Sequence, residues 1–209
     1  MNKRVIIAAV AVAMAFVLAP GKALAQKYQG QMNVTAGASF SLTGLFINTI
    51  MNGVDNVTGV STRSTPGLNG MLDYGVTDRF SIGAAYHYQS FRADFTSYTN
   101  DSGVVMNGDW YASITRQNIG LRTLFHFGDN DDLDTYAGAR FGYTFWSAKT
   151  NATGSGIDKN TATSRLWPQA LFGMRYFFTP NIGVNVEFSV GPPYYMMFGL
   201  NARFGGGGA

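Results

Sequence analysis

The stretch Gln31–Thr43 reads QMNVTAGASFSLT, and it decides the fold class. Its even positions carry the apolar side chains Met32, Val34, Ala36, Ala38, Phe40 and Leu42. Its odd positions carry Gln, Asn, Thr, Gly or Ser. A repeat of two residues is typical of a β-strand, whose successive side chains point to opposite faces, and no helix produces it. The stretch therefore predicts a strand with one apolar face and one small polar face.

Further segments repeat this alternation and are separated by turn residues. With the first strand they make eight predicted strands, at residues 31–43, 68–77, 80–89, 116–127, 137–146, 166–178, 182–190 and 194–204. A soluble sandwich or lipocalin-like barrel also alternates, but its outer face meets water and is rich in charge. Here only 13% of residues are charged, against about 25% in soluble domains. The polar face is built from Gly, Ser, Thr and Asn, which favours a membrane barrel whose apolar face meets lipid.

Outward aromatic residues support the membrane interpretation, because they gather at both ends of the predicted strands. One group comprises Tyr74, Phe80, Phe127, Phe178 and Phe204, and the other Tyr86, Tyr88, Tyr143, Phe145 and Tyr194. Such groups are typical of the two interfaces of a membrane. The sequence thus predicts an all-β protein, an eight-stranded antiparallel up-and-down transmembrane β-barrel.

The connections between the strands predict the orientation of the barrel. Short links at 77–80, 128–133 and 179–181 alternate with long polar ones at about 46–65, 96–108 and 149–164. Short periplasmic turns and long outer loops are the pattern of outer-membrane barrels. We therefore expect the outer membrane of a Gram-negative-type bacterium, with both termini in the periplasm.

The N-terminal segment has the layout of a secretory signal peptide. A basic head, Lys3-Arg4, precedes the apolar run Val5–Leu18, and Ala23-Leu24-Ala25 supplies a cleavage site. An uncleaved anchor is the alternative, but the run is short for a spanning helix. We divide the chain into a cleaved signal peptide at 1–25, a barrel at 26–204 and a Gly-rich tail at 205–209. The net charge of +3 disappears with the signal peptide, which contains no acidic residue.

Five charged residues fall on the inward face of the predicted strands and at similar height: Asp73, Arg122, Arg140, Arg175 and Glu187. The lumen of an eight-stranded barrel is just wide enough for its own side chains. We expect these charges to form an internal ion network that fills the lumen. The alternative is a gate whose ion pairs exchange partners and open a narrow pore.

Three aromatic residues, Trp146, Trp167 and Tyr195, are predicted to point inward near the outer end of the lumen, with Trp110 above them. Aromatic packing that caps the polar lumen is the expected role. A pocket for small apolar molecules, and hence a carrier, is the alternative.

No catalytic site is evident in the sequence. The two histidines, His87 and His126, point inward by phase, and no serine or carboxylate forms an evident dyad with either of them. Pro168 and the pair at 192–193 could interrupt strand pairing and admit lipid sideways, which leaves a lipid-modifying enzyme as an alternative. Strand-end prolines are the simpler interpretation, so we expect no enzymatic activity.

The acidic turn 129–134 is the one segment that invites a metal-binding interpretation. It lacks glycine at the sixth position, and its twelfth position is Arg140, where an EF-hand needs glutamate. We interpret it as a solvated turn and expect no metal and no cofactor. The basic residues form no stripe, so nucleic acid is not an expected partner.

The signal peptide, the eight strands and the ending Gly199-Leu200-Asn201-Ala202-Arg203-Phe204 resemble the small OmpA/OmpX-type outer-membrane β-barrel proteins. The resemblance covers the mature chain and implies a monomer surrounded by outer-membrane lipid. It also implies that Gly199, Ala202 and Phe204 form the signal read by the barrel-assembly machinery. Two features depart from the family: a Gly-rich tail follows Phe204, and we expect no peptidoglycan-binding domain after the barrel.

The expected function is structural, adhesive or partner-binding, because function concentrates on loops held by a rigid scaffold. The long loops at 46–65, 96–108 and 149–164 would contact an extracellular protein or surface ligand. Within the first loop, the apolar residues 45–47 and 50–51 are candidates for that contact. A narrow pore, a carrier and a lipid-modifying enzyme remain as alternatives.

Overall fold

The computed structural model describes residues 29–43, 57–127, 130–152 and 164–205. The predicted signal peptide at 1–25, the apolar residues at 45–47 and 50–51, and the tail beyond Gly205 lie outside this part of the chain. Within the described ranges, no helix is both long enough and apolar enough to cross a membrane.

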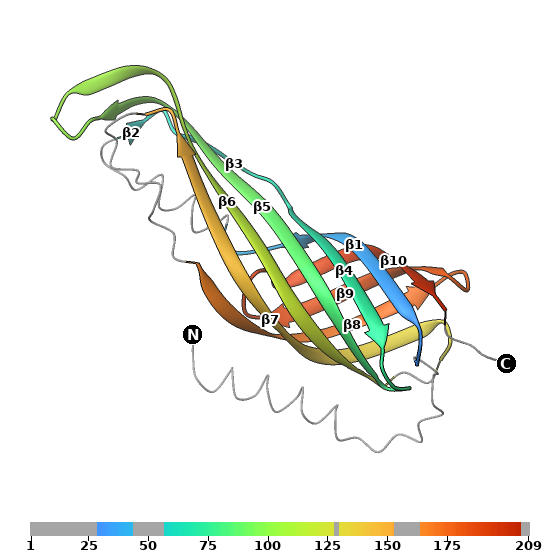
Figure 1. The fold of residues 1–209 in the computed structure, drawn as a ribbon. Coiled ribbons are helices and arrows are strands. Elements are labelled where there is room, and N and C mark those ends of the chain that lie inside the picture. The colour runs from blue at the N-terminus through green and yellow to red at the C-terminus, as the bar shows by residue number, and fades with distance from the viewer. Residues whose placement is uncertain (1–28, 44–56, 128–129, 153–163, 206–209) are drawn as a thin grey trace, which may run out of the picture.

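Eight strands close into an antiparallel barrel, and the first strand pairs with the last (Figure 1). They are β1 (Met32–Phe40), β4 (Gly67–Gly75), β5 (Phe80–Thr99), β6 (Val105–His126), β7 (Leu133–Thr150), β8 (Arg165–Phe177), β9 (Ile182–Val190) and β10 (Met196–Phe204). Every strand pairs with its neighbours in this order, and β1 closes the barrel against β10. The prediction of an eight-stranded up-and-down barrel is confirmed.

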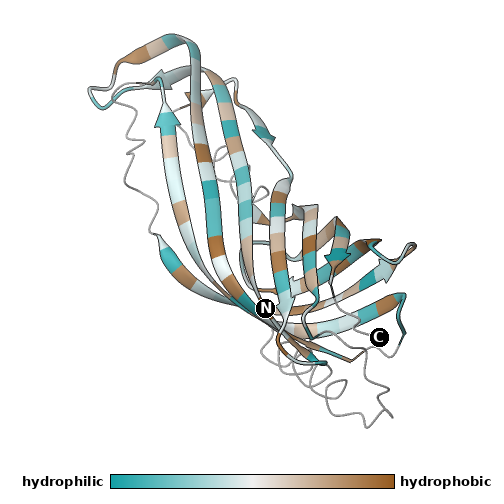
Figure 2. Cartoon of the chain, turned by 45° about the vertical axis from the view of Figure 1, so that its right-hand side comes forward, coloured by the Kyte–Doolittle hydropathy of each residue, from teal (hydrophilic) through white to brown (hydrophobic). Residues whose placement is uncertain are grey.

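The apolar face of the strands points outward and the polar face fills the interior. Figure 2 shows the resulting alternation of brown and teal residues along the barrel strands. Leu121 is 71% exposed and Leu200 is 64% exposed, whereas the lumen-facing Asn118 and Asn201 are each only 1% exposed. A soluble protein would bury its leucines, so this inverted arrangement fits a wall surrounded by lipid.

Exposed aromatic side chains lie near both ends of the barrel wall. They are Tyr74, Phe80, Phe178 and Phe204 at one end, and Tyr86, Tyr143 and Phe145 at the other. The prediction for Tyr194 is wrong, because its side chain is fully buried in the lumen. The turn at 191–193 and Tyr194 precede the regular part of β10, which begins only at Met196. The alternation therefore slips by one residue at this turn.

The two ends of the barrel differ in construction. At one end the strands are joined by the short turns 76–79 and 178–181, and the two ends of the barrel chain lie beside these turns. The Gly30 amide donates to the Gly75 carbonyl at 2.9 Å, and the Arg203 amide donates to the Asn181 carbonyl at 2.9 Å. We call this end the turn end, and the opposite end the projecting end.

At the projecting end, β5 and β6 continue far beyond the barrel wall as a long hairpin (Figure 1). The short strands β2 (Val57–Thr58) and β3 (Ser61–Ser64) pair with β5, and the end of β7 pairs with β6. We call residues 57–64, 90–99, 105–115 and 147–150 the projecting sheet. The side chain of Asn100 closes its tip by accepting hydrogen bonds from the amides of Ser102 and Val104.

The prediction of loops at 46–65 and 96–108 is therefore wrong in part. The loop predicted at 96–108 contains the last residues of β5 and the first of β6, and the loop predicted at 46–65 contains β2 and β3. Residues 153–163 of the third predicted loop lie outside the described residues. Alternation continues in β5, with Phe91, Ala93 and Phe95 buried, but the opposite face turns polar. A strand with one polar face and many Ser and Thr residues looks like a loop in the sequence.

The seam between β1 and β10 depends on a close approach of two backbones. Gly37 faces Gly199 across the seam. A Cβ atom added at Gly37 would lie well inside contact distance of the Phe198 carbonyl oxygen and at 2.7 Å from the Cα of Gly199. Because backbone atoms cannot move aside as a flexible side chain can, this position requires glycine.

Candidate functional site

A network of buried ion pairs occupies the lumen near the turn end. Arg122 on β6 donates through Nη2 to Glu187 Oε2 at 2.6 Å, and its Nε lies 3.1 Å from Asp73 Oδ1. Arg175 on β8 contacts the other oxygen of Asp73. All of these side chains are at most 1% exposed. The structure thus brings together four of the five charged residues that the sequence placed in the lumen.

Two tyrosines that the sequence analysis did not place in this network complete it. The Tyr136 hydroxyl donates to Glu187 Oε2 at 2.8 Å, and the Tyr194 hydroxyl donates to Glu187 Oε1 at 2.5 Å. The guanidinium of Arg175 also lies 4.7 Å from the centre of the Tyr136 ring. The Glu187 carboxylate therefore accepts one arginine and two phenol donors, which satisfies a charge that is removed from water.

Asp134 is another member that the sequence analysis missed. We predicted a solvated turn at 129–134, but Asp134 is fully buried and its Oδ2 lies 3.2 Å from Arg175 Nη1. The alternation of β7 predicts that Asp134 is buried, because Asp134 falls on the same inward face as Tyr136 and Arg140.

Arg140, the fifth predicted residue, lies apart from these ion pairs. It faces Arg122 directly across the β6–β7 ladder, and like charges repel. Its Nη2 instead contacts the side-chain oxygen of Asn118, which lies further toward the projecting end. Within the described ranges, Arg140 forms no ion pair with a carboxylate.

Two of the three predicted aromatic residues line a pocket at the projecting end of the lumen. The pocket has a volume of about 370 Å³, and we call it the mouth pocket. Its lining residues are Thr43, Arg116, Thr144, Trp146, Arg165, Trp167 and Pro192. Tyr195 does not belong to it, because the phase slip before β10 leaves Tyr195 exposed and places Tyr194 in the lumen. Trp110 lies elsewhere, 5.1 Å from the ring of Tyr98 in the projecting sheet.

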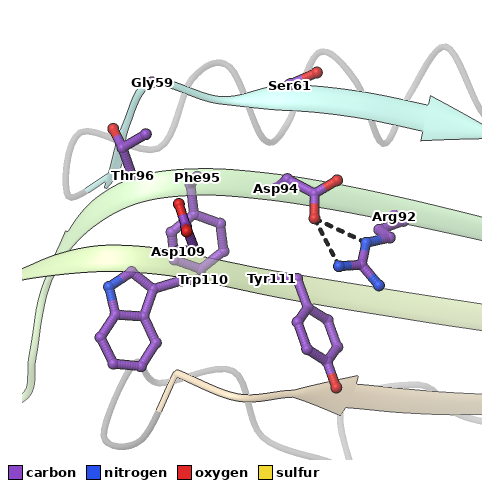
Figure 3. A pocket seen from close by; sticks show the side chains of 9 residues that line it. All are labelled: Gly59, Ser61, Arg92, Asp94, Phe95, Thr96, Asp109, Trp110 and Tyr111. Atoms are coloured by element: carbon purple, nitrogen blue, oxygen red, sulfur yellow. Dashed lines mark hydrogen bonds and ion pairs between the residues drawn. The ribbon is translucent and has the colours of Figure 1, made fainter.

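A second pocket, of about 330 Å³, lies on the projecting sheet (Figure 3). Arg92 Nε donates to Asp94 Oδ1 at 2.8 Å, and the Arg92 guanidinium lies 4.2 Å from the centre of the Tyr111 ring. Asp109 and Trp110 line the same pocket. Sequence reasoning missed this site because its residues lie outside the eight predicted strands, most of them just beyond the ends of the strands predicted at 80–89 and 116–127.

One protein-family model matches most of the chain. The model described as outer membrane protein beta-barrel domain matches residues 8–192. The chain belongs to this family. No curated protein matches the sequence at a significant level. Membership of the family places the barrel in the outer membrane and confirms the resemblance to small outer-membrane barrels.

Solved structures of outer-membrane barrels resemble this barrel. OprG from Pseudomonas aeruginosa is 11% identical, with a TM-score of 0.52 over 85% of this chain and 97% of OprG. The N-terminal barrel domain of OprF from Pseudomonas aeruginosa is 14% identical, with a TM-score of 0.44 over 86% and 100% of the two chains. Ail from Yersinia pestis, in complex with the heparin analogue sucrose octasulfate, is 13% identical, with a TM-score of 0.43 over 84% and 99%. At these identities the similarity to OprG shows the fold alone.

The lumen of this outer-membrane barrel also contains a serine, a histidine and an aspartate in series. The Ser81 hydroxyl lies 2.9 Å from His126 Nε2, and His126 Nδ1 lies 2.8 Å from Asp134 Oδ1. No dyad with either histidine is evident in the sequence, but the structure places a serine and a carboxylate on His126. The three residues lie on β5, β6 and β7. The register between these strands brings them together, and that register cannot be read from the sequence.

We propose that this triad stabilises the turn end and does not act as a nucleophilic site. Ser81 and His126 are each 2% exposed, and Asp134 is shared with Arg175. A hydrolase needs the nucleophile to reach a substrate carbonyl. We expect the folded protein in detergent to gain no mass from a fluorophosphonate probe over hours. Labelling of the wild-type protein that is lost in Ser81→Ala would contradict this assignment.

The predicted assembly signal lies on the strand that closes the outer-membrane barrel. Gly199, Ala202 and Phe204 face Gly37, Val34 and Met32 of β1 across the seam. Phe204 is 49% exposed on the outward face. Recognition of these residues by the barrel-assembly machinery stays a prediction.

Proposed function

We propose that this outer-membrane barrel is a surface protein that binds an extracellular partner through the projecting sheet. In this proposal the turn end and both termini face the periplasm, and the projecting end faces the outside of the cell. The barrel acts as a monomeric scaffold without enzymatic activity and without a cofactor.

The observation that carries the proposal is a change of polarity on one face of β5 and β6. Along the outward face of β5, Ile82, Ala84 and Tyr86 give way to Ser90, Arg92 and Asp94. Along the outward face of β6, Leu121 and Ile119 give way to Gln117, Thr115 and Ser113. Tyr86 marks the boundary, where its hydroxyl donates to the side-chain oxygen of Gln117 at 2.9 Å. An outward face that turns polar and charged belongs in water, beyond the apolar band of the membrane.

The projecting sheet has a small hydrophobic core of its own. Phe95, Tyr98, Ala112 and Ala152 are buried together, with Trp110 packed against them. The rings of Phe95 and Tyr98 meet edge to face at 6.1 Å. Strands held by such a core keep their shape without a partner, so binding loses little conformational entropy.

The chemistry of the exposed face favours a polar partner. Asp94 pairs with Arg92 at 2.8 Å and with Arg63 at 3.7 Å, and these arginines are largely exposed. Tyr111 adds aromatic surface to this face, and Asp109 and the partly buried Trp110 line the same pocket (Figure 3). Aromatic and arginine side chains are the residues that most often dominate binding at protein surfaces. An extracellular protein or a surface glycan fits this combination.

The test compares two shortened hairpins. Ala93 faces Ala112 across the ladder, so residues 94–111 can be replaced by an Asn-Gly turn that removes the tip of the sheet. The matched control replaces only the turn 100–104 with Asn-Gly, between the paired Thr99 and Val105. Cells that express each variant are incubated with immobilised collagen, laminin and a glycan array. We expect the wild type and the control to bind at least one coating, and the tip deletion to lose that binding.

An epitope tag tests the orientation of the barrel in the same cells. A tag in the turn 100–104 should be labelled by antibody on intact cells, and a tag in the turn 77–79 only after permeabilisation. Labelling in the opposite pattern would contradict the orientation. Binding by the tip deletion equal to the wild type, or no binding by any variant, would contradict the partner-binding function.

A further inference from the structure

We propose that the mouth pocket is a second binding site, which takes a small acidic sugar: one ring that carries a carboxylate or phosphate group. The site lies within the barrel mouth and shares no lining residue with the pocket on the projecting sheet. It is therefore independent of partner binding by that sheet. Two arginines and two tryptophans line the pocket.

Arg116 is a buried cation whose described partners are a hydroxyl, an amide oxygen, a backbone carbonyl and the imidazole of His87, and none of them is a carboxylate. It is 2% exposed, and its Nη1 donates to Thr43 Oγ1 at 2.7 Å. Its Nη2 donates to Gln89 Oε1 at 2.7 Å and to the Pro193 carbonyl at 2.6 Å. Among the residues that the structure describes, Arg116 has no ion pair with a carboxylate, and its Nε has no hydrogen-bond partner.

This situation contrasts with that of Arg122 and Arg175 deeper in the lumen, whereas Arg140 likewise has no carboxylate partner within the described ranges. Arg122 and Arg175 each contact two carboxylates. Buried charges in proteins are normally paired, because an unpaired charge is costly away from water. The neutral donors and acceptors around Arg116 orient its guanidinium without neutralising it. An acidic ligand in the mouth pocket would supply the missing negative charge.

Arg165 gives the pocket a second cation. It lies on β8 opposite Thr144 of β7, and its exposed side chain forms no ion pair within the described ranges. Guanidinium groups bind carboxylate and phosphate oxygens through paired hydrogen bonds. Two arginines on one pocket select an anion and disfavour the small apolar molecule that the sequence left open as an alternative.

The two tryptophans supply flat surfaces for a ring. Trp146 faces Arg116 across the β6–β7 ladder, and its ring centre lies 5.7 Å from the guanidinium carbon. Trp167 lies on β8 opposite Gly142 of β7 and lines the same pocket. Indole faces pack against the apolar faces of rings. The pocket volume of about 370 Å³ lies at the lower end of the range for small-molecule sites, about 300–1,000 Å³. It suits a single sugar unit with its acidic group.

The chain allows a direct optical test, because it contains three tryptophans and two of them line the pocket. In a Trp110→Phe background, all indole fluorescence comes from Trp146 and Trp167. The full chain, folded in detergent micelles at low salt, is titrated with glucuronate, glucose 6-phosphate, glucose and inorganic phosphate. We expect a saturable fluorescence change with the two acidic sugars, none with glucose, and weaker binding of inorganic phosphate, which has no ring.

Arginine variants test the charge requirement. Arg165→Gln should weaken binding of both acidic sugars about tenfold or more, because it removes charge-assisted hydrogen bonds. Arg116→Gln should have at least as large an effect. The Arg165 variant is the decisive test, because its exposed side chain can be changed without disturbing the fold. Arg63→Gln, on the projecting sheet, is the matched control and should bind as tightly as the parent.

The outcomes separate the proposal from its alternatives. Equal responses to glucose and glucuronate, unchanged affinity in Arg165→Gln, or no saturable response would overturn the proposal. Inorganic phosphate binding as tightly as glucose 6-phosphate would overturn the role of the tryptophans. Purified lipopolysaccharide is added as a competitor to distinguish the source of the ligand. Competition would identify the ligand as an acidic sugar of the membrane lipid, and no competition would identify it as a soluble acidic sugar. Both results support a binding site in the mouth pocket.

Discussion

Replacing Glu187 with glutamine is expected to lower the free energy of unfolding by about 3–5 kcal/mol, the usual effect of removing one partner of a buried ion pair. Glu187 accepts hydrogen bonds from Arg122, Tyr136 and Tyr194. Glutamine keeps the volume of the side chain but removes its charge. The guanidinium of Arg122 would then keep one carboxylate partner, Asp73, which Arg175 already contacts. The cost comes from a buried charge left without its closest partner.

The measurement is denaturant unfolding of the barrel in lipid vesicles, followed by tryptophan fluorescence. Asp101→Asn is the matched control, because it also removes one carboxylate but lies in the exposed turn at the tip. We expect the control to change the free energy of unfolding by less than about 0.5 kcal/mol, as surface substitutions usually do. A loss below about 1 kcal/mol in Glu187→Gln would show that the network does not stabilise the barrel.

Replacing Gly37 with valine is expected to weaken closure of the barrel, lowering the free energy of unfolding by about 3 kcal/mol. The added side chain points into the lumen, against the Phe198 carbonyl oxygen and the Cα of Gly199. Both atoms belong to the backbone of β10, so the clash can be relieved only by moving β1 away from β10. Hydrogen bonds of the seam would lengthen as a result.

Gly70 provides the control for this substitution. It lies on β4 opposite Ala36 of β1, and a Cβ atom added there meets nothing within 4 Å. Gly70→Val should therefore fold as well as the wild type, since valine is favoured in strands. The fraction of each variant that keeps the compact, faster-migrating form on a gel without heating reports closure. Equal fractions for the two variants would show that the seam tolerates a side chain at Gly37.

The wall of the barrel could be predicted from the sequence because alternation is a property of each strand alone. It assigns Asp73, Arg122 and Glu187 to the lumen without knowledge of their neighbours. The contacts between them depend on strand offsets, which alternation does not contain. Alternation alone therefore groups Arg140 with the network, although its cross-strand neighbour is Arg122. The Ser81–His126–Asp134 series was missed for the same reason.

Two other errors come from places where the alternation itself changes. At the 191–193 turn the phase slips by one residue, which exchanges the positions of Tyr194 and Tyr195. In β5 the alternation continues beyond Gln89, but the outward side chains become Ser, Arg and Asp. A polar strand that leaves the membrane has the composition of a loop, so only its pairing with β3 and β6 identifies it.

The hairpin of β5 and β6 has a mechanical consequence. Each strand runs from the turn end to the tip without a break, with one register shift between Phe95 and Ser97. A bound partner that pulls on the tip would therefore load the strands along their own axes. Under that geometry the hydrogen bonds between β5 and β6 and their barrel neighbours resist in shear, many at once, instead of opening one after another. The same two strands therefore form both the hairpin that bears the load and the part of the barrel wall that anchors it.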